Sequence, residues 1–148
     1  MTGPPPVTAV PAAVVDASVW TSRFVVQDVH HVPSRQWLEA QMTGGGLVIA
    51  PTLLLTEVAG AVARRSGDPG LAHRVVRDIL LLTESRLVGL DRRLGADAAR
   101  LAADLRLRGA DAVYVAVAHS LQIPLITWDR EQLTRAAGRI ALRTPWQR

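Results

Sequence analysis

The chain has 148 residues and a formal net charge of +4 at pH 7, from 17 basic and 13 acidic residues. Hydrophobic residues make up 49% of the sequence and charged residues 20%, a balance that predicts one folded domain rather than a disordered chain. Cysteine is absent, which excludes disulfides, thiolate zinc sites and cysteine nucleophiles. All 17 basic residues are Arg, so a P-loop or a Schiff-base enzyme, each of which needs a Lys, is also excluded.

Proline is frequent at the start of the chain, at positions 4, 5, 6 and 11. This pattern predicts a flexible, extended tail over residues 1–12, followed by a single domain over residues 13–148. No run of 18 apolar residues occurs, and the first residues lack the basic segment of a secretory signal. We therefore expect no membrane span and a cytoplasmic protein.

Short apolar runs alternate with helical patterns along the rest of the chain. Strands are predicted over residues 13–15, 47–50, 87–90, 123–128 and 140–142. Helices are predicted directly after residue 16 and over residues 33–42, 52–65, 71–83, 92–108, 110–121 and 129–137. The helix over 110–121 has no evident polar face, so we expect it to be buried. The alternation is typical of an α/β fold, in which helices cover both faces of a central, mainly parallel sheet.

Acidic residues follow several of the predicted strands. Asp16, Asp91 and Asp129 lie at the carboxyl ends of strands, where ligands bind in parallel sheets. Asp111 lies at the start of the buried helix and Glu57 in the helix after the second strand, so both can reach the same edge. Each residue also has a simpler role. The four aspartates can cap helices, and Glu57 can be a solvated helix residue. Asp91 has no feature beyond capping.

Carboxylates gathered at one edge of a sheet need a compensating charge. Two of them ~4 Å apart repel by about 4 kcal/mol at an effective dielectric near 20, so protons or a cation must accompany them. Mg²⁺ and Mn²⁺ prefer oxygen ligands and keep several bound waters. Such an ion activates water and stabilises negative charge on a phosphoryl oxygen. The acidic residues therefore point to a site that hydrolyses phosphodiesters.

Four segments of the chain resemble the four motifs of PIN-domain nucleases, especially VapC-type toxins. They are Val14-Val15-Asp16-Ala17-Ser18-Val19, Leu55-Thr56-Glu57-Val58, Leu107-Arg108-Gly109-Ala110-Asp111-Ala112-Val113-Tyr114-Val115-Ala116 and Leu125-Ile126-Thr127-Trp128-Asp129-Arg130. The third motif is the most specific and the second is weak, and the similarity runs from about Ala13 to Arg143. The resemblance implies a PIN-like α/β/α sandwich and a metal-dependent endoribonuclease.

The resemblance also implies a role for each acidic residue. Asp16, Asp111 and Asp129 would bind Mg²⁺ directly or through water, with Mn²⁺ as a substitute, and Glu57 would orient or activate the attacking water. Hydrolysis would leave a 5′-phosphate and a 3′-hydroxyl on the RNA. Ser18 and Thr127 occupy positions of small hydroxyl residues that support the acids. VapC-type toxins further imply a VapB-like antitoxin as a partner and a homodimer.

Several alternatives remain open at this point. A metal-free ribonuclease would need a paired general acid and base, for which the candidates are the four histidines at positions 30, 31, 73 and 119. The same acids would serve a PIN-like RNA-processing nuclease outside any toxin–antitoxin pair. A catalytically idle RNA-binding module is a third alternative, although the presence of all four acids speaks against it. Trp128 can stack on a base or simply pack against the protein.

The basic composition permits a nucleic-acid partner without identifying one. Arg makes bidentate contacts to phosphate, so a positive excess made only of Arg is compatible with RNA binding. A chain that is rich in Ala and Arg and free of Lys is also what a GC-rich genome tends to encode. The identity of the RNA cannot be predicted from this pattern.

Overall fold

The computed structural model describes residues 9–146 of the chain. Its strands are β1 (Ala12–Val15), β2 (Leu47–Pro51), β3 (Ser85–Val88), β4 (Leu125–Ile126) and β5 (Leu142–Arg143). They form one sheet in the order β3-β2-β1-β4-β5, in which every neighbouring pair is parallel. The predicted parallel sheet is therefore confirmed, with the first strand of the chain at its centre.

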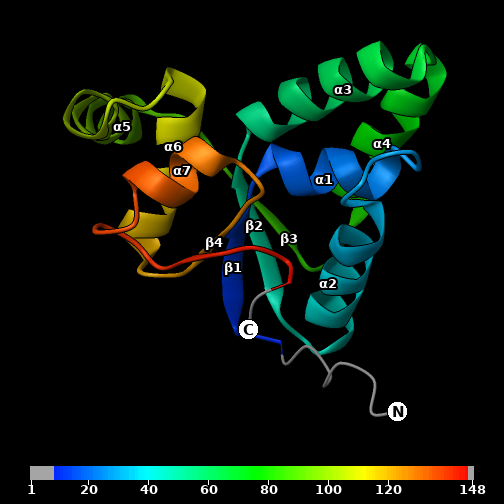
Figure 1. Ribbon diagram of the computed structural model, residues 1–148, viewed down its shortest axis with the longest axis horizontal. Coiled ribbons are helices and arrows are strands. Elements are labelled where there is room, and N and C mark those ends of the chain that lie inside the picture. Colours follow the sequence, from blue (N-terminus) through cyan, green and yellow to red (C-terminus); the bar gives the residue numbers. More distant parts are fainter. Residues whose placement is uncertain (1–8, 147–148) are drawn as a thin grey trace.

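Helices cover both faces of this sheet. They are α1 (Ala17–Phe24), α2 (His31–Thr43), α3 (Leu53–Ser66), α4 (Pro69–Leu81), α5 (Arg92–Leu105), α6 (Gly109–Leu121) and α7 (Arg130–Arg135). In Figure 1, α5, α6 and α7 lie on one side of the strands and α1 to α4 lie on the other. The chain is thus a three-layered α/β/α sandwich, as expected from its sequence.

The central strand β1 is buried on both faces. Ala13, Val14 and Val15 have no exposed surface, because helices cover the sheet from both sides and leave no solvent face that would demand alternation. Val14 lies beside Ile49 of β2 and Leu125 of β4. The continuous apolar run is what fixes this segment at the centre of the sheet.

The helix α6 is the buried helix that the sequence predicts. All seven residues from Ala112 to Ala118 are buried, and α6 packs on β1, β2 and β4 while α5 covers its outer side. A helix enclosed on most sides needs apolar side chains around most of its circumference. Asp111 is the acidic residue in its first turn, so the position of α6 also fixes the position of this carboxylate.

The structure moves the ends of several predicted elements. β3 starts at Ser85 and ends at Val88, two residues earlier than predicted, because its pairing with β2 covers these residues and leaves Leu90 half-exposed. β4 has two residues instead of six. α5 ends three residues early, since Arg106 adopts a left-handed conformation with φ 56°. α4 begins two residues early, at Pro69.

Most of the predicted proline-rich tail falls on residues 1–8, which lie outside the described part of the chain. The packed structure includes Val10, ahead of the predicted boundary at residue 13. The N–H of Val10 donates to Oε1 of Gln41 at 3.0 Å, and its carbonyl accepts from Nε2 of the same side chain at 2.8 Å. A Cβ on Gly46 would collide with this amide, so the close approach requires glycine.

Over residues 9–146, no helix combines the length and the apolar character needed to cross a membrane.

Candidate active site

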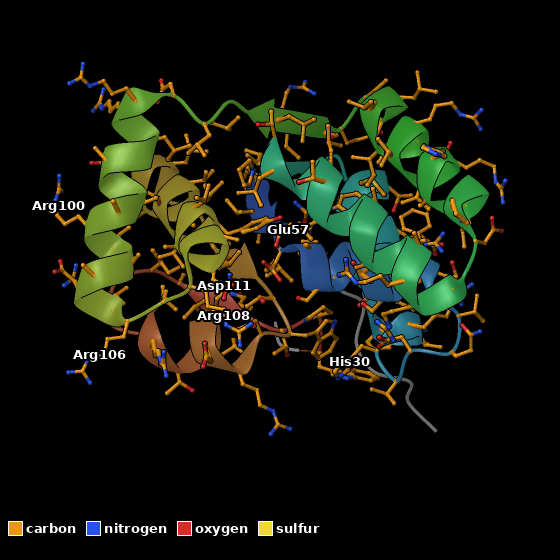
Figure 2. All side chains as sticks on the ribbon, turned by 90° about the horizontal axis from the view of Figure 1, so that it is seen from above. His30, Glu57, Arg100, Arg106, Arg108 and Asp111 are labelled. Carbon is orange, nitrogen blue, oxygen red and sulfur yellow. The ribbon has the colours of Figure 1, made fainter. Side chains whose placement is uncertain are left out.

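Four carboxylates meet at the carboxyl edge of the sheet. Asp16 directly follows β1, Asp129 follows β4, Glu57 lies on α3 and Asp111 on α6. All four line one pocket of about 550 Å³. Figure 2 looks onto this edge and shows Glu57 and Asp111 pointing from their two helices toward the space between them. The structure therefore brings together all four acidic residues that the sequence singles out.

Asp16 caps a helix and faces the pocket at the same time. One carboxylate oxygen accepts the N–H of Ser18 at 3.0 Å and so caps α1, while the other accepts from the Gln132 amide at 3.3 Å. Burial raises the pKa of Asp16; hydrogen bonds with Ser18 and Gln132 oppose that rise, and the charge of Asp129 adds to it. The predicted capping role of Asp16 is confirmed, and Asp16 also lines the pocket.

Asp111 is not a helix cap. The cap position of α6 is Arg108, which makes no capping hydrogen bond through its side chain, and Asp111 lies in the first turn with its side chain half-buried. Burial, together with the charges of Asp129, Asp16 and Glu57, raises the pKa of Asp111 to about 6. Its carboxyl group is therefore held among other acids in a position that serves no local structural purpose.

Glu57 is held in the pocket by a tyrosine. The Tyr114 hydroxyl donates to Oε1 of Glu57 at 2.7 Å. Burial raises the pKa of Glu57, the Tyr114 hydrogen bond opposes that rise, and the charge of Asp16 adds to it. Burial and the surrounding carboxylates raise the pKa of Tyr114 as well, so this hydroxyl stays protonated and remains a donor. Glu57 is therefore not a simple solvated helix residue.

The last acid, Asp129, is fixed by a turn that two hydroxyl residues support. Its carboxylate accepts the N–H of Gln132 at 2.8 Å and caps α7, and its own N–H donates to Oγ1 of Thr127 at 2.9 Å. Ser18 accepts the N–H of Trp128 at 3.1 Å, and the Ser18 and Thr127 hydroxyls lie 3.4 Å apart. The two hydroxyls thus connect the segment after β4 to the segment after β1.

Gln132 is a site residue that the sequence did not reveal. Its side chain is completely buried, and its amide nitrogen lies 3.3 Å from both the Asp16 carboxylate and the Asp111 carbonyl. Its oxygen accepts the Thr127 hydroxyl at 2.7 Å. A Gln three residues after Asp129 is typical of a capping box, whose reciprocal half is not formed because the Asp129 N–H binds Thr127 instead. Gln132 ties three of the four motifs together.

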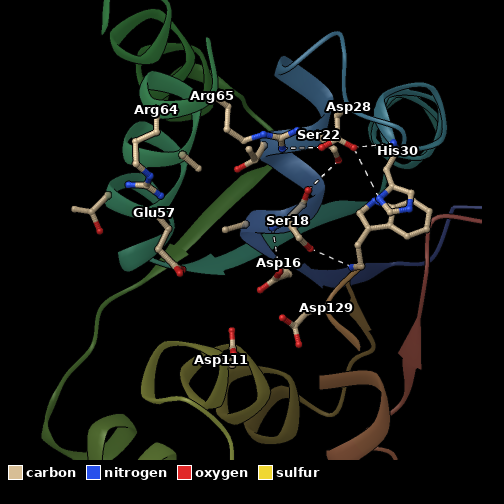
Figure 3. Close-up of a pocket in the computed structure, with 15 residues that line it drawn as sticks. Asp16, Ser18, Ser22, Asp28, His30, Glu57, Arg64, Arg65, Asp111 and Asp129 are labelled. Carbon is tan, nitrogen blue, oxygen red and sulfur yellow. Dashed lines mark hydrogen bonds and ion pairs between the residues drawn. The ribbon is translucent and has the colours of Figure 1, made fainter. Parts of the chain in front are cut away.

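A second wall of the pocket was also missed. It consists of Asp28, His30, Arg64, Arg65 and Trp128, and Figure 3 shows how it faces the carboxylates. Arg65 and Asp28 form an ion pair at 2.6 Å, and the rings of His30 and Trp128 are stacked. Asp28 and His30 lie between two helices in a segment without periodicity, so no sequence pattern placed them at the pocket. The sequence indicates His30 and Trp128 only as candidates for acid–base catalysis and for base stacking.

The remaining candidates lie elsewhere or serve the fold. Asp91 caps α5 by accepting the N–H of Leu94 at 2.8 Å and does not line the acidic pocket. His73 and His119 are exposed, on α4 and α6, and Nδ1 of His31 lies 3.0 Å from the Ser22 carbonyl. A pair of histidines placed for acid–base catalysis is therefore not found among residues 9–146.

The pocket offers oxygen ligands, and the two arginines in its second wall, Arg64 and Arg65, form no ion pair with its four acids in the described structure. None of the ion pairs within the described residues involves Asp16, Glu57, Asp111 or Asp129. In the same part of the chain, no three Asp, Glu or His side chains converge closely enough to hold one ion unaided. A hard divalent cation that keeps several water ligands fits this arrangement, because carboxylates can reach it partly through water.

The match to a family rests on most of the chain. The model of the PIN-domain family matches residues 13–139, so the chain belongs to the PIN-domain family. No curated protein matches the sequence.

Solved structures of toxins share this fold. Mycobacterium tuberculosis VapC20, a toxin that cleaves the sarcin–ricin loop, superposes with a TM-score of 0.73 at 23% identity, over 88% of this chain and 98% of that one. A toxin–antitoxin complex from Klebsiella pneumoniae superposes with a TM-score of 0.66 at 19% identity, over 92% of this chain and 99% of that one. VapBC2 from Rickettsia felis, bound to a fragment of its promoter DNA, superposes with a TM-score of 0.67 at 11% identity, over 90% of this chain and 98% of that one.

Proposed function

We propose that this chain is an endoribonuclease that depends on Mg²⁺ or Mn²⁺ and acts as the toxin of a VapBC-type pair. One observation carries the catalytic part of the proposal. Asp16, Glu57, Asp111 and Asp129 come from four distant segments and line one pocket without an ion-pair partner in the described structure. Burying like charges together costs stability unless a ligand compensates them, so the arrangement favours a bound cation.

Asp16, Asp111 and Asp129 are the residues that would hold this cation, and Ser18 and Thr127 would keep Asp16 and Asp129 in position. When bound, the cation supplies a Lewis acid that acidifies water and offsets the charge of the phosphate. The first two of these acids have raised pKa values. Deprotonated carboxylates are the binding form, so cation binding and proton release are linked.

Glu57 would accept a proton from the attacking water. Tyr114 occupies Oε1 of its carboxylate, which leaves Oε2 as the atom that takes up the proton. Burial raises the pKa of Glu57 and so makes it a stronger base than an exposed glutamate. Water oxygen forms the new bond to phosphorus, the P–O3′ bond breaks, and the 3′-oxygen leaves and takes up a proton. The products are a 5′-phosphate and a 3′-hydroxyl.

The toxin assignment and the partner rest on the fold neighbours. Two of those named above are toxin–antitoxin complexes, and we propose a VapB-like antitoxin and a homodimer for this chain as well.

Cleavage of RNA by the purified protein tests the catalytic proposal. We expect single-stranded RNA to be cut with Mg²⁺ or Mn²⁺, to stay intact with EDTA, and to carry 5′-phosphate ends after cleavage. Asp111→Asn should abolish cutting, while Asp104→Asn on the exposed side of α5 should not. Full activity in EDTA, or in Asp111→Asn, contradicts the proposal.

Expression in cells tests the toxin assignment. Growth arrest on induction, absent from Asp16→Asn, is the expected result, and mapping of RNA ends shortly after induction identifies the target. Cleavage in vitro without arrest would favour an RNA-processing nuclease outside a toxin–antitoxin pair.

A further inference from the structure

Two aromatic rings form a stacked pair in the wall of the acidic pocket. The rings of His30 and Trp128 are nearly parallel, at 7° to each other, and their centroids lie 3.8 Å apart. The two residues are 98 positions apart in the sequence, and both line the pocket that contains the four carboxylates. In Figure 3, His30 lies on the side of the pocket where Asp16 and Asp129 are also seen.

The Trp128 ring is fixed from two directions. Its backbone N–H donates to the Ser18 hydroxyl at 3.1 Å, and its indole N–H donates to the Ser34 hydroxyl at 2.8 Å. Ser34 is buried and lies 2.6 Å from the Ser22 hydroxyl. The ring therefore has a defined orientation before any ligand arrives, which lowers the entropy cost of binding.

The His30 ring is fixed by the segment that carries it. The N–H of His30 donates to the Asp28 carboxylate at 2.7 Å, and that carboxylate is held by Arg65 at 2.6 Å. The side chain of His30 remains 40% exposed. Trp128 covers one face of the ring, and the His30 side chain is partly exposed where it lines the pocket. An aromatic surface is thus available at the pocket.

Trp128 is joined directly to Asp129, so the pair lies one residue from a carboxylate of the proposed catalytic centre. We propose that the His30–Trp128 pair receives an unpaired base of the RNA substrate, next to the nucleotide whose phosphate meets the carboxylates. The proposal rests on the proposed nuclease function and names the part of the substrate that the second wall recognises.

Stacking on this pair predicts a preference for single-stranded or looped RNA. A base inside a duplex has both faces covered by its neighbours, whereas an unpaired base can turn out and lie against an aromatic ring. Every base has a π face, so the contact tolerates different sequences. Packing needs alone do not account for the pair, because a histidine that is 40% exposed adds little to the core.

Binding of single-stranded RNA that lacks one base tests the proposal directly. The protein carries Asp111→Asn to prevent cleavage, and the probes are labelled hexaribonucleotides in which an abasic nucleotide occupies each position in turn. With the ring pair intact, one or two abasic positions should weaken binding about 5- to 20-fold. An abasic nucleotide at any of the other positions should change the affinity by less than about twofold.

Two substitutions of similar size separate stacking from folding. His30→Phe keeps an aromatic face and should keep the position-dependent penalty, while His30→Leu should reduce it to less than about twofold. His73→Ala, on the exposed side of α4, is the control that should change nothing. Trp128→Phe, which loses the indole N–H and part of the bicyclic ring but keeps an aromatic face, should retain the penalty. Thermal melting checks that each variant is folded.

The possible results separate this proposal from the nuclease function. If His30→Leu leaves the abasic penalty intact, or weakens every probe equally, the pair does not hold a base and the proposal is wrong. If the protein with an intact Asp111 cuts no RNA in Mg²⁺, the nuclease function itself fails. Two results together support both the base-stacking proposal and the nuclease function. The first is an abasic penalty that His30→Leu removes and the other variants keep, and the second is cleavage that depends on Asp111.

Discussion

The Tyr114 hydroxyl donates a 2.7 Å hydrogen bond to Oε1 of Glu57 and thereby ties α6 to α3. Tyr114 has no exposed surface and lies three residues after Asp111 on the same buried helix. One helix therefore carries one carboxylate of the pocket and holds a second through its tyrosine. The bond sets the position of Glu57 relative to the other acids.

Removal of this hydroxyl should slow cleavage without weakening RNA binding. In Tyr114→Phe, Glu57 keeps its charge but loses the contact that fixes its orientation, so we expect kcat to fall by roughly tenfold while KM changes little. The lost hydrogen bond should also lower the free energy of unfolding by about 1 kcal/mol. Steady-state kinetics and denaturant unfolding measure the two effects.

A double variant controls for indirect effects. If Tyr114 acts only through Glu57, adding Tyr114→Phe to Glu57→Gln should change kcat no further. Equal losses from Tyr114→Phe in both backgrounds would show that the tyrosine acts through something other than Glu57.

Asp111→Asn should stabilise the metal-free protein at neutral pH. Its carboxylate is surrounded by three others, which contribute to a pKa of about 6. Neutralising it should raise the free energy of unfolding by roughly 1–2 kcal/mol, after allowance for screening of a half-exposed group. For a chain of this length that corresponds to an increase in Tm of roughly 3–6 °C. Thermal melting in EDTA measures it, and Asp104→Asn should show no such gain.

The same group makes stability depend on pH. The folded-state pKa of Asp111, about 6, lies above its ordinary value of 3.8, so between these values the folded protein binds more protons than the unfolded chain. The contribution of Asp111 to stability is therefore fully present below pH 3.8 and is lost as the pH rises through 6.

Unfolding curves between pH 4 and pH 8 in EDTA check this sign. The difference in stability between Asp111→Asn and the native sequence should grow in favour of the variant over that range. It should shrink when Mg²⁺ is added, because bound cation compensates the ionised carboxylate. A difference that does not vary with pH would contradict the raised pKa.

Gln132→Leu should damage both the fold and the site. The substitution keeps the volume of a fully buried side chain but leaves the Thr127 hydroxyl without its acceptor and Asp16 without one of its donors. We expect a loss of about 2–4 kcal/mol in the free energy of unfolding and reduced cleavage. Gln36→Leu, on the exposed side of α2, is the matched control. Unfolding in urea at constant Mg²⁺ measures the loss.

Arg64→Ala should weaken RNA binding through its charge. Arg64 follows Glu57 by about two turns of α3, lines the pocket (Figure 3) and takes part in no ion pair within the described residues. Loss of one phosphate contact at an exposed position should raise KM by about three- to fivefold. It should also reduce the slope of log K against log salt by about 0.7.

The control for this prediction is Arg100→Ala. Arg100 lies on α5, away from the pocket (Figure 2), and is paired with Asp97. Its removal should leave both KM and the salt dependence unchanged. Equal effects of the two substitutions would indicate a response to net charge rather than a contact at Arg64.

The fold was predictable because its signals are local. The apolar run before Asp16 identifies a strand that is buried on both faces, and the unbroken apolar surface around Asp111 identifies a buried helix. Parallel strands place their carboxyl ends at one edge, so Asp16 and Asp129 could be expected there before any contact was known. The same argument also placed Asp91 at this edge, where it does not line the acidic pocket. The ends of elements such as β3 and β4 depend on pairing with other strands, which a local pattern does not contain.

The bracing of the site was not predictable in the same way. Gln132 contacts Asp16, which is 116 positions away, and Tyr114 contacts Glu57 across 57 positions. Polar contacts of this kind leave no periodic trace in the sequence. The segment from Asp28 to His30 is irregular, so its place in the pocket wall follows only from the packing of α1 against α2.

The central position of β1 has a consequence for synthesis of the chain. Its neighbours are β2 and β4, so one edge of the first strand stays unpaired until Leu125 and Ile126 are available. Asp129, the last of the four acids, arrives later still. A nascent or truncated chain that ends before β4 lacks a neighbour of β1 in the sheet, and it also lacks Trp128 and Asp129 of the pocket. The acidic pocket is therefore completed only after residue 129 has been made, and a nascent chain that stops earlier does not contain it.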